Sequence, residues 1–174
     1  MKSRYFPLLG ALGFLLVFPF FLSRKTRVLR RKIIRAAPAE VFPFINDLRN
    51  WPRWTEWNRR DDFHFTYDGP PSGIGATQRW ENSRGDGSLK VVQSVENERV
   101  TYDLEMNRGK YHLEGLIALE PLGAVTRVSW LCKWQSGTNP YNRYRDLFFK
   151  VVIGRDFEAG LENLKGVIEN QRVA

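Results

Sequence analysis

The sequence predicts an α+β domain in which an antiparallel sheet precedes a long C-terminal helix, with an apolar membrane segment in front of both. Between residues 64 and 134, apolar and polar residues alternate in short runs separated by turn residues, which is typical of antiparallel strands. After Pro140 the apolar spacing becomes helical, because Leu161, Leu164 and Ile168 fall on one face. A chain of 174 residues is long enough for one domain with a sizeable core.

The first element is an uncharged run over residues 5–22, YFPLLGALGFLLVFPFFL. As a helix it would extend ~27 Å, close to the thickness of a bilayer's hydrocarbon core. We therefore expect an uncleaved transmembrane helix. A cleaved signal peptide is the competing interpretation, but the run is long for a signal sequence and lacks a small-x-small cleavage pattern at its end.

Positive charge is concentrated around this run. Residues 1–35 hold nine basic side chains and no acidic one, which leaves 18 basic against 19 acidic side chains in the remainder. A nearly neutral globular part argues against nucleic acid as the partner. Residues 23–27 are expected to form a basic juxtamembrane linker. The six basic residues between Arg24 and Lys32 favour a single-pass protein of the cell membrane with a cytoplasmic C-terminal domain.

Two short helices are expected after a first strand over residues 28–34. Ala37 and Pro38 open a helix that continues through Phe44, and Asp47 or Asn50 can cap a second one. The second helix would carry three of the chain's six tryptophans at helical spacing, since its first turn tolerates a proline. These are Trp51, Trp54 and Trp57.

The sheet is expected to follow in antiparallel order. Its strands are predicted over residues 64–67, 76–82, 88–95, 99–106, 110–121 and 126–134. Asp86 and Gly87 are a good signal for a hairpin turn. In the terminal helix, Gly154 and Gly160 are expected to bend or divide the helical run.

Three stretches in this order carry a resemblance to a known family. RKIIRAAPAEVFPFINDLRNWPRWTEW resembles the opening of the SRPBCC superfamily, the START-like helix-grip proteins, and particularly its polyketide cyclase/dehydrase-type branch. GLIALEPLGAVTRVSW resembles that branch's late strands, and DFEAGLENLKGVIE its C-terminal helix. The resemblance implies a ligand-binding domain over residues 28–171, in which a curved sheet wraps the terminal helix around a cavity.

The same resemblance suggests what the three tryptophans do. They would close one end of the cavity beside the two short helices, as packing residues with large buried areas. Trp54 or Trp57 would be the ones to touch a ligand, and contact with the membrane is a third interpretation.

Strand alternation predicts the lining of the cavity. Residues on one face of each strand should point toward the terminal helix, and they are mainly apolar and aromatic, as a hydrophobic ligand requires. The predicted ligand-binding residues are Trp54, Gln78, Trp80, Tyr102, Leu104, Tyr111, Leu113, Trp130 and Trp134.

No catalytic residue is assigned from the sequence, and no metal or cofactor is expected. His64 and His112 lie on separate strands without metal-ligand spacing, and Cys132 is expected to be buried and inert. The stretch GIG at residues 73–75 leads into a strand, so it lacks the helix N-terminus of a phosphate site.

Three functions stay open at this point. The first is a non-catalytic domain that binds a hydrophobic small molecule or lipid beside the membrane. The second is an enzyme resembling polyketide cyclases or dehydratases, which would need an acid or base projecting into the cavity. The third is a tethered domain whose outer surface recruits a protein partner of unknown identity. The apolar lining favours the first.

Overall fold

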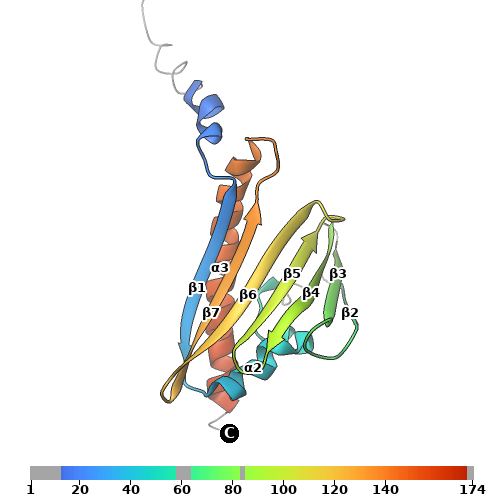
Figure 1. Cartoon of the computed structure of the whole chain (residues 1–174), viewed down its shortest axis with the longest axis vertical. Helices are drawn as coiled ribbons and strands as arrows, with labels where there is room; N and C mark the ends of the chain where they lie inside the picture. Colours follow the sequence, from blue (N-terminus) through green and yellow to red (C-terminus); the bar gives the residue numbers. More distant parts are fainter. Residues whose placement is uncertain (1–12, 58–63, 83–84, 172–174) are drawn as a thin grey trace, which may run out of the picture.

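The computed structural model describes residues 13–57, 64–82 and 85–171 (Figure 1). After a short 3-10 helix η1 (Phe18–Phe20), the first strand is followed by two short helices, six further strands and one long helix. The bounds are β1 (Lys25–Ile34), α2 (Pro38–Asn46), the 3-10 helix η2 (Leu48–Arg53), β2 (His64–Asp68), β3 (Thr77–Asn82), β4 (Gly85–Val95), β5 (Arg99–Met106), β6 (Tyr111–Leu122), β7 (Val125–Gln135) and α3 (Asn142–Gln171).

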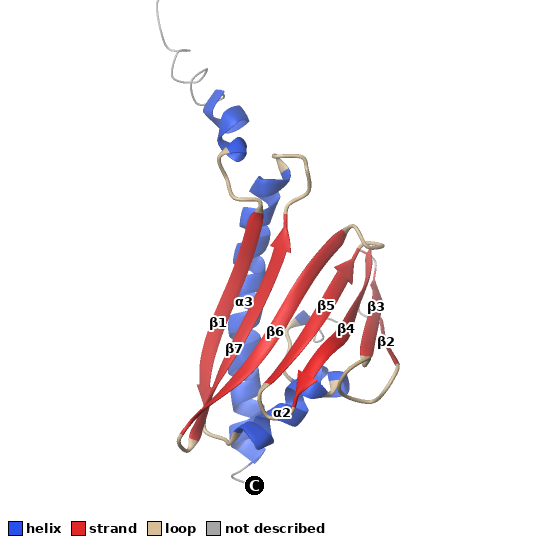
Figure 2. Cartoon of the chain, in the orientation of Figure 1, coloured by secondary structure: helices blue, strands red, loops and turns tan. Residues whose placement is uncertain are grey.

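The strands form one antiparallel sheet in the order β1-β7-β6-β5-β4-β3-β2. The sheet curves, and α3 runs along its concave side, behind β1 and β7 (Figure 2). The start of α3 and the N-terminal segment lie at one end of the domain, whereas α2 lies beside the end of α3 (Figure 1). This is the helix-grip α+β fold expected from the sequence.

Alternation along the strands is as predicted. In β7, Val128, Trp130 and Cys132 are buried toward α3, and Lys133 is exposed on the opposite face. The pattern continues in β5, where Val100 and Tyr102 are buried. A consistent inward face of this kind fixes the register of the sheet, because a one-residue slip would expose the whole apolar set.

Several expected boundaries are wrong. β1 begins at Lys25, where it pairs with Gln135, so residues 25–27 belong to the strand and not to a linker. Asp86 and Gly87 lie within β4, opposite Glu81 and Trp80, so the β3–β4 turn is shorter than expected. The pairing of β3 with β4 continues through Asp86 and Gly87 and overrides the local turn propensity of these two residues.

The tryptophan-bearing segment also differs from the prediction. It is the 3-10 helix η2, which Asp47 caps by accepting a hydrogen bond from the backbone N–H of Arg49 at 2.8 Å. The helix ends at Arg53, so it contains Trp51 but neither Trp54 nor Trp57. The three tryptophan rings are therefore brought together by the turn after η2 and not by a shared helical face.

α3 is one continuous helix of 30 residues, so Gly154 and Gly160 do not divide it. Both glycines lie where α3 contacts the sheet. A Cβ at Gly160 would lie 3.1 Å from the Trp130 ring, and one at Gly154 would lie 2.5 Å from the Arg30 guanidinium. The absent side chains therefore let α3 approach the sheet closely.

The predicted membrane segment lies partly outside the described residues, since these begin at residue 13. Residues 13–17 are helical and lead into η1, and Phe14 and Phe20 are exposed. Across the described part of the chain, no helix has the length and apolar character needed to cross a membrane.

Candidate ligand cavity

Tryptophans fill the space between η2, β7 and the second half of α3. Trp51 and Trp54 are fully buried, and their indole N–H groups donate to the carbonyls of Ile45 and Phe44 at 3.1 and 3.0 Å. The ring of Trp130 lies 5.0 Å from that of Trp54 and stacks on Phe157 at 3.8 Å. We call Trp51, Trp54, Trp57, Trp130, Tyr102 and Phe157 the aromatic cluster. The indole N–H groups of Trp51, Trp54 and Trp130 are paired within the protein, so these rings are packed as core.

Tyr102 completes the cluster from β5. Its hydroxyl oxygen accepts a hydrogen bond of 2.8 Å from Trp130 Nε1, and its ring covers Gly115, where a Cβ would lie only 2.0 Å away. Burial raises the pKa of the Tyr102 hydroxyl well above its ordinary value. The group is therefore a neutral hydrogen-bond acceptor at physiological pH.

A cavity lies at the other end of the domain, between the first turns of α3 and the ends of β5, β6 and β7. Its volume is about 1310 Å³. The lining includes inward residues such as Leu113 and outward ones such as Glu114, so the space continues around the end of the sheet. It is an open hollow and not a closed chamber.

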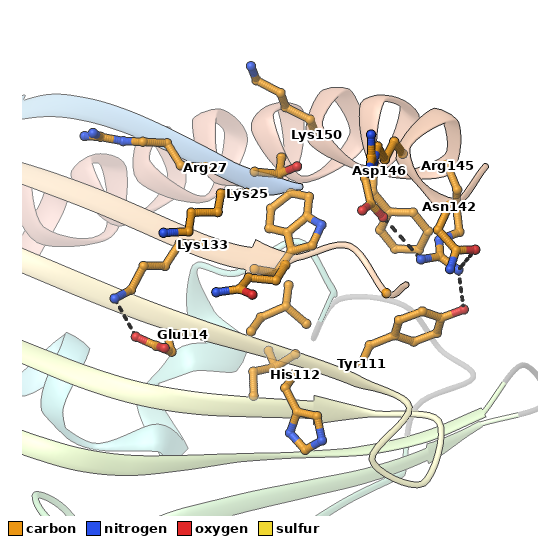
Figure 3. Close-up of a pocket in the computed structure, with 18 of the residues that line it drawn as sticks. Lys25, Arg27, Tyr111, His112, Glu114, Lys133, Asn142, Arg145, Asp146 and Lys150 are labelled. Carbon is orange, nitrogen blue, oxygen red and sulfur yellow. Dashed lines mark hydrogen bonds and ion pairs between the residues drawn. The ribbon is translucent and has the colours of Figure 1, made fainter. Parts of the chain in front are cut away.

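The inner wall of the cavity is apolar, with a polar cluster where α3 begins. Arg145 Nη1 donates to the Tyr111 hydroxyl at 3.0 Å and its guanidinium lies 4.7 Å from the centre of the same ring (Figure 3). Asp146 is buried and accepts hydrogen bonds from Ser136 Oγ and, at 3.3 Å, from Arg145 Nη2. These bonds hold the β7–α3 connection against the helix.

The margin of the cavity is positively charged. Seven basic side chains line the space against four acidic ones, which leaves an excess of positive charge around it. Lys133 pairs with Glu114 at 2.6 Å on the outer face of the sheet (Figure 3). Lys25 and Lys150 come from β1 and α3 respectively. An apolar wall beside a basic margin suits an amphipathic ligand with an acidic end.

A sheet wrapped around a long helix, with a hollow at one end, is the arrangement that the sequence resemblance implies. A model of the family described as "Polyketide cyclase / dehydrase and lipid transport" matches residues 25–169. The chain belongs to this family. The resemblance to the SRPBCC superfamily is thereby confirmed, and the match begins where β1 begins.

Solved structures share the fold at low sequence identity. The KanY protein (ms6282) is 18% identical with a TM-score of 0.64, and the match covers 83% of this chain and 98% of that one. CalU16 from Micromonospora echinospora is 17% identical with a TM-score of 0.56, over 87% of this chain and 90% of that one. Protein CV1439 from Chromobacterium violaceum is 16% identical with a TM-score of 0.56, over 85% and 99%. No curated protein matches the sequence.

The residues predicted to bind a ligand separate into two groups. Four line the cavity: Leu104, Tyr111, Leu113 and Trp134. The other five do not: Trp54, Gln78, Trp80, Tyr102 and Trp130. Three of these belong to the aromatic cluster, Gln78 is buried and donates to the Tyr67 hydroxyl at 3.2 Å, and Trp80 covers Gly87. Inward orientation was predicted correctly for all the strand residues, but it does not distinguish packed core from cavity wall.

Arg145, Asp146 and Ser136 were not singled out from the sequence. Asp146 lies in a charged stretch, NRYRD, which is indistinguishable from a solvated helix start. Its burial depends on Ser136, ten residues earlier and across the β7–α3 connection. A buried carboxylate at a cavity was the feature that an enzyme was expected to need.

The two histidines and Cys132 are placed as expected. His64 is exposed, and His112 is exposed beside Glu105, with Nδ1 3.4 Å from the carboxylate. Cys132 is buried, and burial raises the pKa of its thiol to about 12. Within the described residues, no group of His, Cys, Asp and Glu side chains is placed to hold a metal ion.

Proposed function

We propose that this chain is a membrane-anchored SRPBCC domain that binds a hydrophobic small molecule or lipid without transforming it. The observation that carries the proposal is the cavity of about 1310 Å³ at the start of α3, with an apolar inner wall and an excess of basic side chains at its margin. Area and shape would hold the apolar part of the ligand, and the basic margin would attract an acidic end.

Anchoring is supported by the uncharged run over residues 5–22 and the basic residues that follow it. Leu22 and Ser23, at the end of the run, also line the cavity. The proposed protein therefore crosses the cell membrane once and keeps its domain on the cytoplasmic side. A reporter enzyme fused to the C-terminus should be active in the cytosol, and a mature protein that begins after Ser23 would contradict this part.

Binding is favoured over catalysis by the bonding of the polar groups. Both oxygens of Asp146 accept hydrogen bonds from the protein, and the Tyr111 hydroxyl accepts one from Arg145. A general base must come within hydrogen-bond reach of the substrate. The side chain of Asp146 is only 5% exposed and is held by Ser136 and Arg145. The groups at the cavity are instead arranged as a brace between the sheet and the helix.

The second candidate is an enzyme of the cyclase or dehydratase type, and the buried carboxylate of Asp146 is the observation that favours it. The family description includes both cyclases and lipid transport. For an enzyme, Asp146→Asn should abolish turnover while leaving ligand affinity largely intact. For a carrier, the same change should weaken the helix connection and lower the melting temperature.

Native mass spectrometry of the detergent-extracted full-length protein tests occupancy, because a retained lipid or other hydrophobic ligand adds a defined mass. A fluorescent fatty acid then tests the cavity itself. Leu104→Trp should reduce its affinity by about tenfold, since the larger ring occupies the apolar wall. Leu116→Trp is the matched control, because Leu116 is a half-buried residue of β6 that does not line the cavity. Equal affinity of both variants and the parent for the fatty acid would overturn the proposal. Tighter binding of the acid than of its methyl ester would support a role of the basic margin in attracting an acidic end.

A further inference from the structure

The exposed side of α3 changes character along its length. Phe148, Val151, Arg155, Glu158 and Glu162 follow one another at helical spacing and are all exposed. The first two are apolar and the last three are charged. Phe148 is 68% exposed and Val151 is 52% exposed, which is unusual for large apolar side chains on one helix face.

The two carboxylates of this stripe have partners in the sheet. Glu158 lies 3.7 Å from the Arg30 guanidinium, and Glu162 pairs with Lys32. Both pairs join α3 to β1 in a solvated setting. The apolar half instead continues into two further exposed residues, Leu147 and Tyr141. We call these four residues, Tyr141 directly before α3 and Leu147, Phe148 and Val151 within it, the apolar α3 face.

The N-terminal segment is attached next to this face. Arg143 Nη1 donates to the carbonyls of Pro19, Phe20 and Leu22 at 2.5, 2.9 and 2.9 Å. These carbonyls lie at the end of η1 or just after it, and that of Pro19 also accepts a hydrogen bond from the backbone N–H of Leu22 at 3.3 Å. A guanidinium at that point also complements the negative end of the helix dipole.

Two tyrosines extend the attachment. Tyr144 Oη donates to the Leu15 carbonyl at 2.6 Å, and the Tyr141 ring lies edge-on to Phe20 at 6.4 Å. Phe20 therefore contacts the apolar α3 face through Tyr141, whereas Phe14 stacks on Phe18, whose ring lies 6.4 Å from that of Tyr144. Phe14, Phe18 and Phe20 all belong to the uncharged run over residues 5–22.

We propose that the apolar α3 face is inserted into the interfacial layer of the bilayer that residues 5–22 enter. The inference rests on the proposed anchoring and adds a second, peripheral contact to it. A helix that lies at a membrane surface buries apolar and aromatic side chains at the headgroup boundary and keeps basic ones at the polar side. Lys150 on α3 and Arg24 beside the segment fit an anionic lipid surface.

The contact would place the cavity at the membrane surface. Leu22 and Leu147 line the cavity and belong to the attached segment and to the apolar α3 face respectively. A hydrophobic ligand could then pass between bilayer and cavity without crossing water. The charged second half of α3 would point away from the lipid, so the helix would meet the membrane only by its first turns.

Site-specific fluorescence on the full-length protein tests the contact. Phe148→Cys and the matched control Glu158→Cys are labelled with an environment-sensitive dye and reconstituted in vesicles of phosphatidylcholine and phosphatidylglycerol. Cys132 is only 4% exposed, so the introduced thiols react selectively, and the labelled parent gives the background. Quenchers are nitroxide groups on the acyl chains and iodide in the water.

The label at position 148 should lose roughly half or more of its emission to the lipid nitroxide and resist iodide, as expected for a site at the acyl boundary. The label at position 158 should show the reverse. If the protein floats with the vesicles and both labels respond only to iodide, the membrane contact is overturned while anchoring stands. Protection of position 148 from both quenchers would mean that a second copy covers the face. That result also overturns the proposal, as does failure of the protein to float. Retained ligand in native mass spectrometry reports on the cavity independently of these outcomes.

Discussion

Trp130 and Trp134 are four residues apart on the same face of β7, yet they have different surroundings. Trp130 is fully buried among the rings of the aromatic cluster, whereas Trp134 is half-buried and borders the cavity. The difference comes from what lies opposite each ring. The Trp51 ring of η2 packs against the Trp130 ring. Trp134 lies further along β7, beyond the part of the strand that η2 covers.

This contrast shows how one fold can be solid at one end and hollow at the other. α3 mirrors it, because its inward residues Phe157, Leu161 and Leu164 are buried, while Asp146 and Lys150 stand at the cavity. The filled end gives the domain its stability, so the open end is free to keep unfilled volume. Unfilled volume in a packed interior is costly, and a binding domain must offset that cost elsewhere.

The most severe test of the contrast is truncation of one tryptophan at each end. Trp54→Ala should lower the free energy of unfolding by roughly 3–5 kcal/mol, because a fully buried indole leaves a cavity and an unpaired Phe44 carbonyl. Trp134→Ala should cost about 1–2 kcal/mol, since its ring already borders open space. Urea titration of both variants measures the difference. Equal losses would show that the two ends are packed alike.

Glycine substitution tests the close packing of the filled end. Gly115→Ala should destabilise the domain by roughly 1–3 kcal/mol, because the new Cβ would lie within 2.0 Å of the Tyr102 ring. Gly166→Ala is the control, since a Cβ there would meet no atom within 4 Å. That change should stabilise α3 by up to about 1 kcal/mol. Thermal unfolding should therefore shift in opposite directions for the two variants.

The order of elements and the inward face of each strand could be predicted because they depend on local periodicity. Trp130 and Trp134 both follow the alternation of β7, so both were predicted to face α3. The prediction could not tell them apart, because what covers each ring comes from η2, almost 80 residues earlier. Empty space has no local signal in a sequence, whereas a filled position is marked by a large side chain.

The start of α3 was the least predictable part of the candidate site. Asp146 is buried only because the chain returns from β7 at Ser136, and Arg143 is engaged only because η1 ends beside it. Ser136 and Asp146 are separated by the β7–α3 connection, whose path the sequence does not reveal. Arg143 and the end of η1 are far apart in the sequence. Helical periodicity predicts the face of a charged residue but not the partner that would bury it.

The same chemical change at two tyrosines sharpens the contrast. Tyr102→Phe should cost roughly 1–2 kcal/mol, since it leaves the buried indole N–H of Trp130 without its acceptor. Tyr111→Phe removes an acceptor from Arg145, but that half-buried guanidinium keeps Asp146 and can reach water. Its cost should be about 0.5 kcal/mol or less. Chemical denaturation gives both values, and a larger loss for Tyr111→Phe would mean that the cavity end depends on the brace.

A loss of stability at alkaline pH should also originate in the filled end. Burial raises the pKa of the Cys132 thiol from 9.0 to about 12, so the unfolded chain loses this proton at lower pH than the folded one. The resulting stability is complete below pH 9 and is lost as the pH rises from there toward 12. At pH 10 the loss from this group should be about 1 kcal/mol.

Cys132→Ala separates this contribution from that of other groups that titrate in the same range. The variant should be less stable than the parent at pH 7 because a buried sulfur is removed, and the gap should narrow by about 1 kcal/mol at pH 10. The free energy of unfolding of the variant should still fall as the pH rises, because the raised pKa of Tyr102 acts in the same direction. Urea unfolding at a series of pH values measures both slopes. Parallel curves for parent and variant would show that the thiol is not held protonated by burial, and that water reaches the filled end as it reaches the cavity.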